Sequence, residues 1–135
     1  MYTKVNHIGI AVNDIEKSLE IYRDLLGLEL ESTHEVPAQK VLTAFFPVGE
    51  THLELVQPTE GNVTIRKFLE KRGEGIHHIC FEVEDIETAL AALKARGARL
   101  IDEVPREIEG SKKKMAFLHP KSTGGVLIEL YQINM

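Results

Sequence analysis

The chain repeats one short segment, and this repeat limits the folds open to it more than any other feature. Residues Val5–Ile15 read VNHIGIAVNDI and residues Ile76–Ile86 read IHHICFEVEDI, with His7 and His78 at the same place in the two copies. Alternating apolar residues that stop at an Asp predict a strand followed by a helix with an Asp N-cap. We therefore expect two copies of one structural unit, each with a His on its first strand.

The rest of the chain predicts how each unit continues. Three extended segments separated by Pro and Gly follow the first helix, so the first module is βαβββ and covers about residues 1–60. Residues 61–75 form a connector with a short helix, and about residues 76–135 repeat the plan. The predicted fold class is α+β, with two tandem βαβββ modules related by pseudo-two-fold symmetry in a single domain. In the second module the extended segments are expected near Leu100–Val104, Lys114–Leu118 and Val126–Tyr131.

Charge and composition exclude several classes of function. A net charge of −5 argues against broad binding to nucleic acids or anionic membranes, because both need a basic surface. No apolar run approaches the roughly 20 residues that span a bilayer. The single Cys80 forms no internal disulfide, and the first strand begins almost at Met1, which leaves no room for a targeting peptide. We expect a cytoplasmic protein with no nucleic-acid partner and no membrane partner.

Each module also closes on a strand with a glutamate between apolar residues, Glu54 in the first and Glu129 in the second. A carboxylate in mid-strand is unusual, because strands disfavour Glu and burial of an unpaired charge is costly. If each last strand pairs with its own first strand, His7 and Glu54 share a face, as do His78 and Glu129. Two imidazoles and two carboxylates suit an octahedral divalent transition ion and leave two positions for water or substrate. The residues leave the choice among Co, Mn, Ni, Fe and Zn open.

Three other features have structural interpretations beside functional ones. Alternation points His77 away from His78, which indicates a histidine packed in the core or against a helix. His52 shares the face of Glu54, and it either lines a pocket or simply begins a strand. The run Lys112–Lys114 is typical of a solvated loop, although phosphates also favour such clusters.

Longer motifs of the chain resemble the methylmalonyl-CoA epimerases of the vicinal-oxygen-chelate superfamily. The resemblance covers nearly the entire chain and implies a strongly curved mixed sheet that encloses a metal site. By this resemblance the metal ligands are His7, Glu54, His78 and Glu129, and the ion is divalent, with Co favoured over Mn, Ni, Fe or Zn. The motifs that carry it are HIGIAV at 7–12, LEL at 53–55, HHI at 77–79, FLHPK at 117–121 and GGVLIEL at 124–130.

The resemblance also implies a reaction, the interconversion of the two epimers of methylmalonyl-CoA. Removal of the α-proton makes an enolate, whose charge a bound metal stabilises. Glu129 is the preferred base, and Glu54 is the candidate for the opposite face of the carbon. Certain family members carry a Glu on the third strand of the first module, where this chain has Thr43. The expected substrate-binding residues are Lys121, His119, Gln39 and Thr43.

Two alternatives to an epimerase remain open at this stage. The first is an isomerase of the glyoxalase I type, a lactoylglutathione lyase, whose ligand set resembles this one and which also moves a proton next to a carbonyl. The second is a non-catalytic protein of the same fold that sequesters a small molecule, which the presence of Glu54 and Glu129 argues against. The expected partner is a CoA thioester substrate, and a homodimer is expected from resemblance alone.

Overall fold

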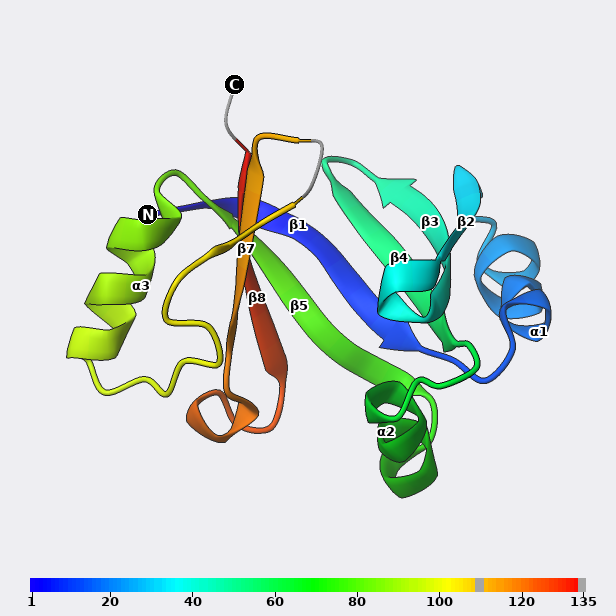
Figure 1. The fold of residues 1–135 in the computed structure, drawn as a ribbon. Coiled ribbons are helices and arrows are strands. Elements are labelled where there is room, and N and C mark those ends of the chain that lie inside the picture. Colours follow the sequence, from blue (N-terminus) through cyan, green and yellow to red (C-terminus); the bar gives the residue numbers. More distant parts are fainter. Residues whose placement is uncertain (109–110, 134–135) are drawn as a thin grey trace. The chain divides into compact units, whose positions relative to one another are not determined.

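The computed structural model describes residues 1–108 and 111–133. The chain forms two compact units, which we call the first unit (His7–His77) and the second unit (Met1–Asn6 with His78–Met135). Strand β1 (Tyr2–Ala11) is divided between them. Each unit follows the predicted order of one strand, one helix and three strands (Figure 1).

The first unit is a four-stranded sheet in the order β2-β3-β4-β1, with β1 parallel to β4 and the other pairs antiparallel. Its helix α1 continues as a π-helix, in which Leu26 N donates to Ile21 O at 2.9 Å. Its other elements are α1 (Ile15–Leu19), the π-helix (Glu20–Leu25), β2 (Ser32–Val36), a 3-10 helix (Pro37–Gln39), β3 (Val41–Val48), β4 (Thr51–Pro58) and α2 (Thr64–Arg72).

Alternation divides the sheet of the first unit into two faces, as the sequence predicts. Helix α1 covers one face, where Ile10, Phe46 and Leu55 form the core with Ile15 and other apolar residues. His7 and Glu54 lie on the opposite face, because their neighbours along the strands point into this core. Helix α1 therefore does not cover the face of the sheet that carries His7 and Glu54.

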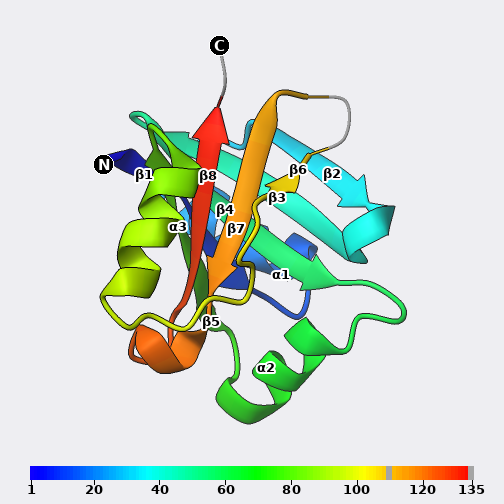
Figure 2. The same cartoon turned by 60° about the vertical axis from the view of Figure 1, so that its left-hand side comes forward.

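The second unit repeats this arrangement in the order β5-β8-β7-β6, with β5 parallel to β8 and antiparallel pairs beyond it. Helix α3 packs against β7 and β8 over a core that contains Ile86, Leu90, Ala116 and Leu130 (Figure 2). The elements are β5 (Gly75–Val83), α3 (Ile86–Ala95), β6 (Arg106–Glu107), β7 (Lys113–Leu118), a 3-10 helix (Pro120–Ser122) and β8 (Leu127–Ile133). Within the described residues, no helix has the length and hydropathy that crossing a membrane requires.

One predicted strand of the second unit is misplaced. The segment near residues 100–104 contributes only an isolated bridge between Leu100 and Leu118, and the two-residue strand β6 forms later, between the two segments predicted as strands. The reason is Asp102, whose carboxylate accepts from Phe117 N at 2.9 Å and from the Arg106 guanidinium at 2.8 Å. The Asp102 carboxylate thus takes the Phe117 N–H of β7, which a longer neighbouring strand would have used for its own backbone pairing.

Helices α1 and α3 begin with the same two hydrogen-bond caps, and the sequence pattern predicted only the first of them. Asp14 and Asp85 are N-caps, accepting from Glu16 N and Thr88 N respectively, as predicted. In addition, Gln57 Oε1 accepts from Ile15 N at 2.8 Å, and Gln132 Oε1 accepts from Ile86 N at 2.7 Å. Each Gln stands three residues after the module's glutamate, so it lies on the opposite face and reaches the start of the helix.

Replacing Gln57 with Met tests this second cap. The change keeps the length of the side chain but leaves Ile15 N without its acceptor, so we expect the free energy of unfolding to fall by about 1–2 kcal/mol. Urea denaturation followed by circular dichroism measures the loss. Gln39→Met, at an exposed position, is the matched control. Equal stability of the two variants would mean that the Gln57 amide does not hold the helix.

Candidate functional site

His78 and Glu129 come together in the second unit through the pairing of β5 with β8. The register sets His78 opposite Leu127 and Cys80 opposite Glu129, so the histidine and the glutamate are diagonal neighbours on one face. His78 Nε2 and Glu129 Oε1 lie 3.9 Å apart, which is longer than a hydrogen bond. Glu129 is only 6% exposed. A nearly buried carboxylate beside an imidazole is a costly arrangement that indicates a function.

The separation of these two atoms fits donors to one metal ion. Imidazole nitrogen and carboxylate oxygen bind divalent ions at about 2.1 Å, so two such donors in an octahedron lie roughly 3.0 Å apart when adjacent and about 4.2 Å apart when opposite. The observed 3.9 Å falls between these values. His78 and Glu129 can therefore each offer an atom to the same cation.

The first unit holds the equivalent pair in the same register. His7 is opposite His52 on β4, and Glu54 is opposite Gly9 on β1, so His7 and Glu54 are again diagonal neighbours on one face. A small residue faces the glutamate in both units, Gly9 here and Cys80 in the second unit. Each unit, taken separately, therefore has the predicted pairing of its first strand with its last strand, which sets one histidine and one glutamate on the same face.

His52 neighbours this pair but contacts a different carboxylate. Its Nε2 lies 3.0 Å from Glu31 Oε2, and its ring meets Phe45 edge-on at 6.3 Å between centroids. Both contacts lie on the Glu54 face of the sheet, because Phe45 is opposite Glu54 in the register. His52 therefore lies on the Glu54 face near the start of β4, a position that accords with both interpretations that the sequence leaves open.

Thr43 and Gln39 occupy different environments. Thr43 is 4% exposed, and its hydroxyl donates to His34 O at 3.2 Å. The register sets Thr43 on the same face as Phe45 and Glu54. Gln39 is exposed at the end of a 3-10 helix, where its backbone carbonyl accepts from Asn62 Nδ2 at 3.4 Å. Thr43 therefore shares the glutamate face, and Gln39 lies on the loop that leads to it.

His119 and Lys121 lie in the turn between β7 and β8. His119 Nδ1 accepts from Lys121 N at 3.1 Å and so shapes the 3-10 helix that follows it. The pKa of His119 is lowered, first by loss of solvent around the ring and then by the charges of Arg99 and Lys121. The Lys121 side chain is exposed. This geometry gives His119 a structural part in the turn, and both residues remain predicted substrate contacts.

His77 points away from the residues of the candidate site, as predicted. Its ring packs edge-on against Phe68 of α2, with 5.1 Å between centroids. Burial lowers the pKa of His77, which favours the neutral imidazole. The prediction of a histidine that packs against a helix is therefore confirmed.

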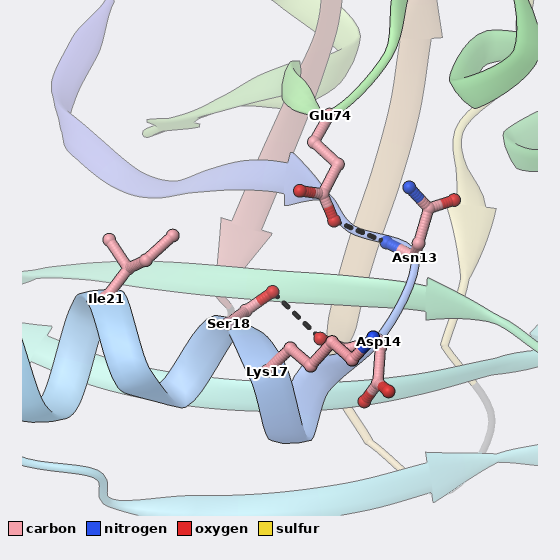
Figure 3. A pocket seen from close by; sticks show the side chains of 6 residues that line it. All are labelled: Asn13, Asp14, Lys17, Ser18, Ile21 and Glu74. Atoms are coloured by element: carbon pink, nitrogen blue, oxygen red, sulfur yellow. Dashed lines mark hydrogen bonds between the residues drawn. The ribbon is translucent and has the colours of Figure 1, made fainter.

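A surface cavity of about 250 Å³ lies elsewhere in the first unit (Figure 3). Glu74 accepts there from Asn13 N at 2.7 Å, and the Ser18 hydroxyl donates to Asp14 O at 2.9 Å. The cavity contains none of the predicted site residues. It is lined by Asn13, Asp14, Lys17, Ser18, Ile21 and Glu74.

Known proteins are similar to this chain over almost its full length. The family model described as Glyoxalase/Bleomycin resistance protein/Dioxygenase superfamily matches residues 6–117. An ethylmalonyl-CoA/methylmalonyl-CoA epimerase of Cereibacter sphaeroides is 40% identical over 134 residues, which are 98% of this chain and 100% of that protein. A probable lactoylglutathione lyase of Vibrio cholerae is 27% identical over 129 residues, 96% of this chain and 90% of that protein.

Solved structures agree with these relatives. A Streptomyces coelicolor methylmalonyl-CoA epimerase variant in complex with 2-nitronate-propionyl-CoA is 34% identical, with a TM-score of 0.85 over 98% of this chain and 96% of that chain. A methylmalonyl-CoA epimerase in complex with methylmalonyl-CoA and NH4+ has the same identity, TM-score and coverage. The predicted α+β fold of βαβββ modules is thereby confirmed. The chain belongs to the methylmalonyl-CoA epimerases, isomerases of the Glyoxalase/Bleomycin resistance protein/Dioxygenase superfamily.

Proposed function

We propose that this protein interconverts the two epimers of methylmalonyl-CoA by moving the α-proton between the two faces of the carbon. The observation that carries the proposal is the nearly buried Glu129 beside His78, in a family whose relatives bear the name of this reaction. Solved relatives in complex with methylmalonyl-CoA and with a nitronate analogue support a CoA thioester as substrate. His7 and Glu54 of the first unit have the same register as His78 and Glu129 of the second unit, which supports a functional role for both pairs.

We propose further that His7, Glu54, His78 and Glu129 hold one divalent metal ion. Support comes from the donor types, from the 3.9 Å between His78 Nε2 and Glu129 Oε1, and from the identical register of the two pairs. Co is the favoured ion, and Mn, Ni, Fe and Zn are alternatives. When bound, the ion supplies positive charge at the thioester oxygen, where negative charge grows as the α-proton leaves.

Glu129 is the proposed base on one face of the carbon. Its carboxylate has two oxygens, so it can accept a proton on one while the other remains oriented. Glu54 is the proposed partner on the opposite face: it takes a proton from solvent before the reaction and donates it to the enolate carbon, and Glu129 then releases the α-proton to solvent, so both carboxyl groups return to their starting states. Thr43 does not serve as a base, because a hydroxyl that donates to a backbone carbonyl stays protonated at neutral pH.

The alternatives keep less support. The lactoylglutathione lyase relative is 27% identical over 129 residues, against 40% over 134 residues for the epimerase relative. Glu129 is buried, Glu54 is half-buried, and each has a histidine neighbour. This pairing argues against a protein that only sequesters a small molecule. A homodimer and a cytoplasmic location stay predictions.

Metal removal tests the proposed function. We expect the chelator-treated protein to lose α-hydrogen exchange of methylmalonyl-CoA in heavy water, and Co or Mn to restore it, because the negative charge on the thioester oxygen needs a cation nearby. Mass spectrometry of the substrate measures the exchange, and circular dichroism checks that the stripped protein stays folded. Absence of exchange with every metal in a folded protein would contradict the proposal.

The variant Glu129→Gln tests the base. An amide cannot take the proton, so we expect the exchange rate to fall about 10²- to 10⁴-fold. Elemental analysis of bound metal separates loss of the base from loss of the ion. Glu60→Gln, at an exposed position, is the control and retains the wild-type rate. Full-rate exchange by a metal-loaded Glu129→Gln protein would assign the base to another residue.

A further inference from the structure

A phenylalanine stands opposite the glutamate in each unit. In the register of β3 with β4, Phe45 is opposite Glu54, and in the register of β7 with β8, Phe117 is opposite Glu129. On the other neighbouring strand, the residue opposite the glutamate is small in both units. Each glutamate therefore has an aromatic ring as the larger of its two cross-strand neighbours. Neither phenylalanine was among the predicted site residues.

The backbone gives these pairs the shorter of the two spacings that an antiparallel sheet allows. Phe117 N donates to the Asp102 carboxylate at 2.9 Å, and Phe117 O accepts from Asp102 N at 3.3 Å. Both groups point away from β8, so Phe117 and Glu129 form a non-hydrogen-bonded pair, with Cα atoms about 4.5 Å apart and side chains close together. In the first unit, Phe45 O likewise accepts from Glu31 N, at 2.8 Å and on the side away from β4.

Arg106 holds the ring of Phe117 from its face. The guanidinium carbon lies 5.5 Å from the centroid of the ring. Arg106 Nε donates to Asp102 Oδ1 at 2.8 Å, and Arg106 Nη2 donates to Asp102 Oδ2 at 3.2 Å. Two parallel hydrogen bonds fix the plane of a guanidinium, and the Asp102 side chain is only 12% exposed. Asp102 therefore holds the backbone of Phe117 directly and its ring through Arg106.

We propose that Asp102 and Arg106 are positioning residues, which hold the Phe117 ring against the Glu129 side chain and so fix the orientation in which the carboxylate meets the α-proton. This inference rests on the proposed function. A glutamate side chain has three rotatable bonds, and Cys80 on the other strand is too small to restrict them. A ring that is itself held in place restricts them from the β7 side.

Steady-state kinetics of the metal-loaded protein tests the proposal. Arg106→Met should lower kcat for methylmalonyl-CoA about tenfold to a hundredfold and leave KM unchanged, because a misplaced base slows the proton transfer without weakening substrate binding. Arg106→Lys keeps a cation over the ring and should recover most of kcat. Arg23→Met is the matched control and should keep both constants, since Arg23 pairs with Asp24 at the same 2.8 Å with a side chain 47% exposed, against 54% for Arg106. Wild-type kcat in Arg106→Met, or an equal loss in Arg23→Met, overturns the proposal.

Phe117→Leu tests the same positioning without removing the ion pair. The smaller side chain keeps the position apolar but takes the ring away from Glu129, so kcat should fall by a similar factor with KM unchanged. Circular dichroism checks that each variant is folded. A folded Phe117→Leu protein with wild-type kcat contradicts the proposal, whatever the stability of Arg106→Met.

Fluorine NMR gives a measurement that does not depend on catalysis. The chain has five phenylalanines, and after incorporation of 4-fluorophenylalanine the resonance that is missing in Phe117→Leu belongs to Phe117. In the Zn-loaded protein, Glu129→Gln and Arg106→Met should each shift this resonance, whereas the controls Glu60→Gln and Arg23→Met should leave it in place. A resonance that responds to neither Glu129→Gln nor Arg106→Met overturns the proposal. Both shifts in a wild-type background that exchanges no α-hydrogen would contradict the proposed function and support the arrangement of Arg106, Phe117 and Glu129.

Discussion

The parallel pairing of the first and last strand in each unit is the constraint on which the rest depends. It sets His7 diagonal to Glu54 and His78 diagonal to Glu129. Side chains alternate along a strand, so a slip of one residue would turn each glutamate into the apolar core under the helix. The hydrophobic pattern of the closing strands opposes that slip, because Leu55 and Leu130 would then leave the core.

The same closing strands also fix the helices. Gln57 and Gln132 follow their glutamates by three residues, and each accepts a hydrogen bond from the first residue of a helix. One strand thus carries a carboxylate on one face and a helix cap on the other. A change of register would lose the cap as well as the core, so helix capping and the geometry of the glutamates support each other.

Burial of Glu129 imposes an electrostatic requirement on the second unit. A carboxylate that is nearly excluded from water needs a compensating positive charge or a set of hydrogen bonds. The neighbouring His78 offers a nitrogen at 3.9 Å, a distance that suits a shared cation better than a direct hydrogen bond. The small residues opposite the glutamates, Gly9 in the first unit and Cys80 in the second, add little volume to the glutamate face of each unit. Each of these faces therefore leaves more space beside its glutamate than a large residue at that position would.

The sequence by itself determined the repeat, the faces of the strands, the one histidine and one glutamate that each module places at matching positions, the Asp caps and the packing position of His77. These features depend on local periodicity and on short motifs, which residues close in sequence decide. Only the tertiary structure decided the Gln caps, the place of β6 and the strand position of Lys113 over Tyr131. Each of these depends on a contact between residues far apart in the chain, and a run of lysines looks the same in a loop and on a strand until its pairing partner is known.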